Sequence, residues 1–207
     1  YNVGVGGCRM SYHTNSSYDG FSMTKLADAI TSKDFSLQEQ CYSELIDMSD
    51  DNTKSYETLI NINFEEIDYI TIAFGTNDFG GAVPLGTIDS EANDSTFYGA
   101  IKYVIETILT TYPHIKLFFM TPIFRWSVPG VGTNSDITPI YEKYLNDYAK
   151  AIIDVCYKYH IPVLDMYNKS NINALNYAYY ISSDGTHPTE EGYTLIAEKL
   201  SKFLLSN

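Results

Sequence analysis

Short apolar runs that alternate with longer amphipathic segments are the feature that most constrains the fold of this chain. The runs cover residues 67–74, 115–120 and 161–166, and each is rich in β-branched or aromatic residues. Runs of this length and apolarity are typical of strands buried on both faces of a sheet. Residues Tyr1–Val5 are a fourth candidate strand.

The segments between and after these runs repeat apolar residues at the helical spacing. Such stripes occupy residues 95–112, 140–156 and the stretch from Tyr193 to the C-terminus, and shorter helices are expected at Phe21–Ile30 and Gln40–Met48. Alternating strands and helices predict right-handed crossovers and a three-layer α/β/α sandwich with a parallel sheet. The length of 207 residues predicts a single domain over residues 1–207.

Charge and cysteine content exclude several classes of protein. The chain has 13 Lys and Arg against 26 Asp and Glu, for a formal net charge of −13. Phosphate backbones and anionic membranes repel such a surface, so no nucleic-acid or membrane partner is expected. No apolar run approaches the roughly 18 residues that span a bilayer. Cys8, Cys41 and Cys156 are too few and too scattered for a disulfide framework or a metal site.

Three polar clusters fall where strands of the predicted sheet end. They are residues 2–9, 75–78 and 184–188, and the last lies directly before the final helix. Ligands of open parallel sheets bind just beyond the carboxyl ends of the strands. The clusters are therefore the candidate functional site.

Asp184 and His187 could form a general-base pair. An Asp three residues before a His can accept a hydrogen bond from Nδ1–H, which leaves Nε2 free to take a proton. Asn77 offers an amide donor, and the Gly6-Gly7 pair lets backbone N–H groups approach an oxyanion. Each cluster alone also fits an ordinary turn or loop.

Together, and in this order, the clusters resemble the SGNH (GDSL-like) hydrolase family. Residues 2–7 are similar to its second sequence block, residues 75–78 to its GxND block, and residues 184–187 to its DxxH block. The resemblance implies the flavodoxin-like fold of that family. It also implies that Gly7 and Asn77 donate to the oxyanion, that His187 is the base, and that Asp184 orients it.

The chain departs from the family in one block. The GDS block that supplies the nucleophilic serine precedes the block at residues 2–7 in the family, and no Gly-Asp-Ser occurs in the chain. Ser11 lies near but lacks the strand-to-helix context. We therefore expect a chain truncated at its N-terminus, without the first strand and helix. The absent strand would lie between Tyr1–Val5 and residues 67–74, and its empty slot predicts poor stability of this chain alone.

Several neighbours of these blocks could bind the substrate. They are Arg9, Asp78, Arg125 and Trp126. Aromatic residues at 177–180 could extend an aromatic surface on which a sugar ring stacks.

The resemblance implies a serine-type esterase that needs no cofactor and no metal. A small ester or an acetylated glycan is the expected substrate, and an extracellular or phage-associated location is favoured over a cytoplasmic one. An inactive glycan-binding module of a surface or phage-tail protein is the alternative. A flavodoxin-type flavin binder would need a Ser/Thr/Gly-rich phosphate loop after its first strand, which is not seen.

Overall fold

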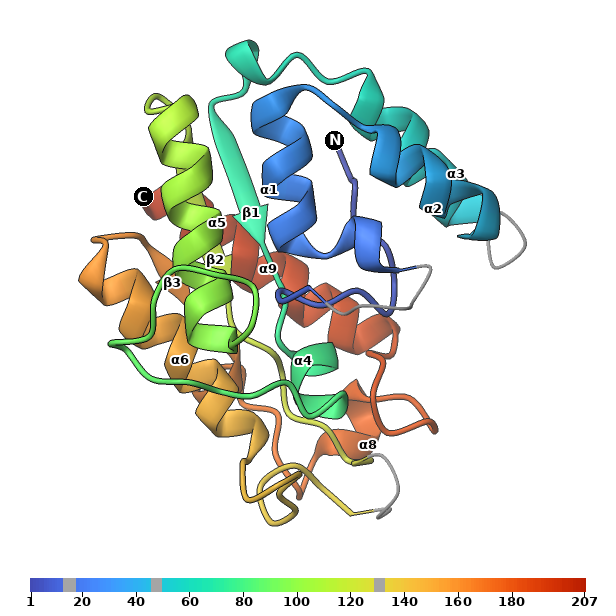
Figure 1. Ribbon diagram of the computed structural model, residues 1–207. Helices are drawn as coiled ribbons and strands as arrows, with labels where there is room; N and C mark the ends of the chain where they lie inside the picture. The colour runs from blue at the N-terminus through green and yellow to red at the C-terminus, as the bar shows by residue number, and fades with distance from the viewer. Residues whose placement is uncertain (13–17, 46–49, 129–132) are drawn as a thin grey trace. The chain divides into compact units, whose positions relative to one another are not determined.

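The computed structural model describes residues 1–12, 18–45, 50–128 and 133–207 (Figure 1). The chain divides into two compact units. The first unit holds residues 1–70 and 86–117, and the second holds residues 71–85 and 118–207. None of the described helices is long and apolar enough to cross a membrane.

The three predicted strands form one sheet. They are β1 (Tyr69–Ile72), β2 (Lys116–Met120) and β3 (Val163–Leu164), in the order β1-β2-β3. β2 and β3 are parallel, with Phe119 opposite Val163 and Met120 opposite Leu164. Helices and a parallel sheet confirm the α/β class, with a fold of the three-layer α/β/α kind. The expectation of strands buried on both faces was wrong for β1 and β3, because Tyr69 and Thr71 are exposed and both residues of β3 are only half-buried.

The prediction of a strand at Tyr1–Val5 was wrong, because these residues are described and form no strand. Local hydrogen bonds replace strand pairing here: the Gly4 N–H donates to Asn2 Oδ1 at 3.1 Å, and the Cys8 N–H donates to Val5 O at 3.4 Å. Gly7 adopts φ 84°, which turns the chain. The predicted gap in the sheet required a strand at Tyr1–Val5 on one side. Because the described residues have no strand there, they do not form this gap.

The first unit is mainly helical. Its elements are η1 (Asp19–Phe21), α1 (Met23–Ser32), α2 (Ser36–Leu45), α3 (Asp50–Ile60), η2 (Phe64–Glu66) and α5 (Phe97–Thr111). α1 and α5 cover the predicted helices at 21–30 and 95–112. α2 covers the first part of the helix expected at 40–48, and residues 46–48 of that helix lie outside the described residues.

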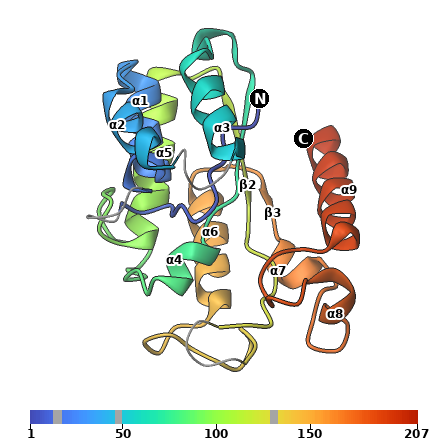
Figure 2. The ribbon, with the colours of Figure 1, turned by 90° about the vertical axis from the view of Figure 1, so that its right-hand side faces the viewer.

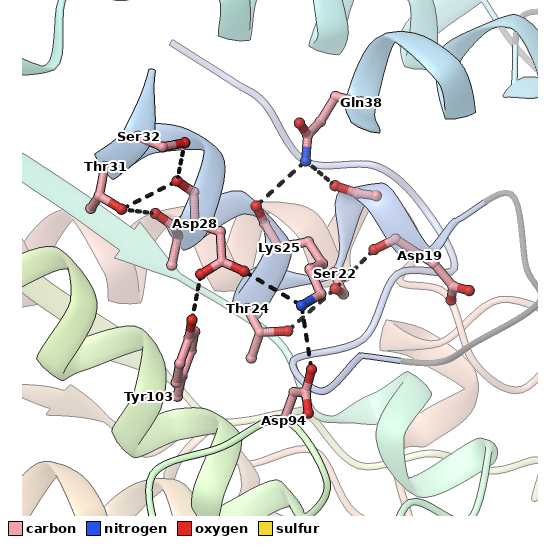
Figure 3. A network of polar contacts seen from close by, with 12 residues as sticks. Asp19, Ser22, Thr24, Lys25, Asp28, Thr31, Ser32, Gln38, Asp94 and Tyr103 are labelled. Carbon is pink, nitrogen blue, oxygen red and sulfur yellow. Dashed lines mark hydrogen bonds and ion pairs between the residues drawn. The ribbon is translucent and has the colours of Figure 1, made fainter. Parts of the chain in front are cut away.

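A polar network links α1 to α5 and to the loop before α5 (Figure 3). Lys25 Nζ lies 3.4 Å from both Asp28 Oδ2 and Asp94 Oδ2, and the Tyr103 hydroxyl donates to Asp28 Oδ1 at 2.5 Å. The bond to Asp28 is the main reason why the pKa of Tyr103 rises to about 12. The network thus fixes the partly exposed edge of the α1–α5 pair.

The second unit holds the remaining helices. They are α4 (Thr76–Gly80), α6 (Leu145–Lys158), α7 (Met166–Lys169), α8 (Tyr177–Tyr180) and α9 (Glu190–Ser206), and α8 contacts α9 (Figure 2). On β2, the Phe118 ring meets Phe203 of α9 edge to face, with 5.9 Å between ring centroids.

Two of the predicted stripes differ from the observed helices. α6 begins at Leu145 rather than Ile140, because Ile140 and Lys143 pair across a tight turn and the Asp147 carboxylate accepts the Tyr144 N–H at 2.8 Å. On α9, Tyr193 was expected to face the core but is 58% exposed. Ala197 is exposed as well, and Ile196, Leu200 and Phe203 are only half-buried, so the predicted stripe of α9 is not a fully buried face.

Candidate active site

Asp184 and His187 lie on the loop before α9 and are in direct contact. His187 Nδ1 is 2.6 Å from Asp184 Oδ2. The His187 side chain is 72% exposed and that of Asp184 49%. The hydrogen bond expected from the DxxH spacing is present, and the imidazole is open to solvent.

The same loop holds the Asp184 carboxylate with three further donors. Asp184 Oδ1 accepts the Thr186 N–H at 2.7 Å, the His187 N–H at 2.9 Å and the Ser182 hydroxyl at 2.8 Å. These bonds, led by the one from the His187 ring, hold the pKa of Asp184 well below its usual range. An ionised carboxylate favours the proton on Nδ1, so Nε2 is the nitrogen that can accept a proton.

Gly185 gives this loop its shape. It adopts φ 72°, and a Cβ at this position would lie 2.6 Å from Ser127 Cβ and 2.8 Å from Ser127 N. Its carbonyl accepts the N–H groups of Trp126 and Ser127 at 2.8 and 3.0 Å. Only glycine combines this backbone conformation with so close a neighbour.

Asn77 lies in the first turn of α4, which residues 73–75 connect to β1. It is half-buried, while Asp78 is completely buried with 0% exposure. Behind α4, Tyr148 of α6 packs edge to face on Phe79 and donates to Val83 O at 2.5 Å. α4 is therefore anchored on the core side, and Asp78 offers no surface to a ligand in this conformation.

Arg125 joins the loop of Asn77 to the loop of His187. Its Nη1 donates to Thr76 O and Thr76 Oγ1, both at 3.2 Å, and its Nη2 donates to Thr186 Oγ1 at 3.1 Å. Burial lowers the pKa of Arg125, and the charge of the nearby Asp184 offsets only part of this effect. We predicted Arg125 from sequence only as a substrate contact, and neither threonine carried a signal, because they bond to a residue far away in the chain.

Trp126 stacks on another aromatic ring. Its indole lies flat on the Tyr177 ring, with 3.7 Å between centroids and 1° between planes. Both pack against the apolar cluster of Phe124, Ile172 and Ile181. Tyr179, on the same short helix as Tyr177, is 61% exposed.

Gly7 and Arg9 belong to the first unit. Gly7 is exposed, and within the described part of the chain no group accepts its N–H. Arg9 is half-exposed. The approach of Gly7 and Asn77 to one oxygen stays a prediction.

Ser11, which was considered as a nucleophile, and the three cysteines are buried. Ser11 is 1% exposed. Cys8, Cys41 and Cys156 form no disulfide and are buried. Burial raises the pKa of Cys156 to about 12, and burial together with Cys41 and Asp19 raises that of Cys8 to about 12. Thiols of this kind are inert. Among the described residues, no group of His, Cys, Asp and Glu could hold a metal ion.

Comparisons with known proteins identify the family of this chain. The model of the GDSL-like lipase/acylhydrolase family matches residues 23–195. One solved structure is 25% identical, with a TM-score of 0.68, over 97% of this chain and 76% of its own. A protein from Lactobacillus plantarum is 30% identical, with a TM-score of 0.61, over 69% of each chain.

A third solved structure, of a possible lipase from Chitinophaga pinensis DSM 2588, shares the fold. It is 21% identical, with a TM-score of 0.55, over 74% of this chain and 77% of its own. No match was found among curated proteins. The family match covers most of the chain, including the GxND block and the DxxH block. The chain therefore belongs to the GDSL-like lipase/acylhydrolase family, a family of hydrolases that act on ester bonds.

Proposed function

We propose that this protein is a serine-type esterase in which His187 is the general base, and that acetyl groups on carbohydrate are its substrate. The observation that carries the proposal is the 2.6 Å contact between His187 Nδ1 and Asp184 Oδ2. This contact orients the imidazole, and Nε2 is left for the reacting proton. Family membership supports the ester bond as the target.

The proposed reaction combines these groups with a serine hydroxyl, which the GDS block supplies in the family. The hydroxyl oxygen attacks the ester carbonyl carbon, and its proton passes to His187 Nε2. Asn77 Nδ2 donates to the resulting oxyanion. The intermediate collapses with cleavage of the carbon–oxygen bond to the alcohol, which leaves with the proton from His187. Water then attacks the acyl-enzyme by the same proton route and releases the acid.

The aromatic residues beside the His187 loop support carbohydrate as the alcohol part of the ester. The backbone N–H of Trp126 donates to Gly185 O, which connects the stacked Trp126 and Tyr177 rings to that loop. Aromatic faces bind the apolar faces of sugar rings. We keep Arg9 as a candidate substrate contact. For the buried Asp78 and Arg125, a role in shaping the site fits better than the substrate contact expected from sequence.

Hydrolysis of p-nitrophenyl acetate and release of acetate from acetylated xylan test the proposal in a protein that carries the GDS serine block. His187→Ala should lower kcat on the order of 10³-fold or more. Asn77→Ala should lower it on the order of 10²–10³-fold, with a smaller effect on KM. His114→Ala is the control, since His114 is an exposed histidine of the first unit.

Equal turnover in His187→Ala and the unmodified protein would remove the proposed base. If the unmodified protein binds acetylated xylan but releases no acetate, the glycan-binding alternative is favoured. Turnover of p-nitrophenyl acetate without release of acetate from xylan would keep the esterase and exclude this glycan.

A further inference from the structure

We propose that Arg125 is a positioning residue that holds the Asn77 loop and the His187 loop together, and that it does not bind substrate. The proposal rests on the function proposed above, because it concerns the same site. It changes the role expected from the sequence, in which Arg125 was a substrate contact.

The Arg125 guanidinium contacts both loops. Nη1 donates twice to Thr76 and Nη2 donates to Thr186 Oγ1, at 3.1–3.2 Å. A planar guanidinium can hold partners on two sides in one geometry, which an ammonium cannot do. All of these residues lie in the second unit.

The two threonines that Arg125 contacts are next to functional residues in the chain. Thr76 directly precedes Asn77, and Thr186 directly precedes His187. Consecutive Cα atoms are about 3.8 Å apart, so a shift of either threonine moves the functional residue that follows it. The guanidinium therefore acts on the oxyanion donor and on the base without contacting either reacting atom.

Arg125 is buried, and its backbone is held in place. The residue is 7% exposed, and its Nε is buried without a hydrogen-bond partner in the described part of the chain. Its backbone is also held, because its N–H donates to Ser135 Oγ at 3.1 Å and its carbonyl accepts the Ser135 N–H at 2.9 Å. Burying a cation costs stability, and here its donors serve the two loops rather than solvent.

Amide hydrogen exchange tests the contact without any need for turnover. In Arg125→Met, the His187 N–H, bonded to Asp184 Oδ1, and the Phe79 N–H, bonded to Gly75 O, should both exchange about 10-fold faster. Thr186→Val removes one partner of the guanidinium and should speed exchange at His187 only. Lys158→Met is the control, since it removes an exposed positive charge of the same unit.

Kinetics on p-nitrophenyl acetate, in a protein that carries the GDS serine block, test the consequence. A small misplacement of catalytic groups costs about 10²-fold, so Arg125→Met should lower kcat by about that factor and leave KM within about 3-fold. Arg125→Lys should recover only part of the loss, because lysine cannot hold both loops in the same geometry. A raised KM with unchanged kcat would make Arg125 a substrate contact and overturn the proposal.

The two readouts separate this proposal from the proposed function. Unchanged exchange in Arg125→Met overturns the positioning role, whatever the turnover. Faster exchange with unchanged turnover also overturns it, since the contact would then be structural only. If Arg125→Met does not fold, exchange at His187 in Thr186→Val decides, and an unchanged rate there is evidence against the proposal. Full turnover in His187→Ala would count against the proposed function alone.

Discussion

Asp184 accepts two hydrogen bonds from His187, one from the ring Nδ1 at 2.6 Å and one from the backbone N–H at 2.9 Å. The carboxylate therefore fixes both the imidazole and the peptide that carries it. Because the residues are only three positions apart, a single loop holds the orienting acid and the base. The Asp184–His187 pair therefore forms within the loop itself, and the other elements of the second unit only position this loop.

The hydrogen bonds to Asp184 predict a pH dependence of stability. The pKa of Asp184 is below its usual range in the folded chain, so the ionised carboxylate stabilises the fold above its unfolded pKa of about 3.9. The stabilisation is lost as pH falls through the folded pKa. Asp184→Asn should therefore melt below the unmodified protein at pH 5–7, and the difference should shrink below about pH 4.

Thermal unfolding followed by circular dichroism between pH 3 and pH 7 measures this difference. Glu198→Gln is the control, because it removes an exposed carboxylate of α9 and should leave the melting temperature unchanged at each pH. A gap between Asp184→Asn and the unmodified protein that stays constant down to pH 3 would contradict the prediction.

Gly185→Ala should destabilise the second unit. The left-handed backbone costs a residue with a Cβ about 1–2 kcal/mol, and the new Cβ would lie 2.8 Å from the Ser127 backbone N, which adds to that cost. Denaturant unfolding measures the loss. Gly6→Ala is the matched control, since an added Cβ there meets nothing within 4 Å. Equal losses in the two variants would show that the conformation of Gly185 is not the cause.

Tyr148→Phe should lower the free energy of unfolding by about 1–2 kcal/mol. The substitution leaves the buried Val83 carbonyl without the hydroxyl that lies 2.5 Å away, and an unsatisfied buried group costs about that much. Tyr157→Phe removes a hydroxyl from the same helix at a side chain that is 84% exposed, and it should change stability little. A Tyr148→Phe protein as stable as Tyr157→Phe would refute this account of how α4 is anchored.

Much of the fold could be predicted because it depends on local patterns. The three apolar runs became β1, β2 and β3, and the stripe at 95–112 became α5. The failures occurred where other local bonds competed with the expected element. Tyr1–Val5 loses strand pairing to the Asn2 side chain and to a glycine turn, and α6 starts late because Asp147 takes the Tyr144 N–H.

The contact between Asp184 and His187 was determined by the sequence alone, since a spacing of three on a tight loop brings a carboxylate within reach of Nδ1. The role of Arg125 was decided only by the tertiary structure. Its partners Thr76 and Thr186 are 49 and 61 residues away in the chain, and no local spacing encodes such a contact. Local hydrogen bonds follow from chain geometry over a few residues, whereas a buried guanidinium between two loops exists only once the sheet and helices have packed.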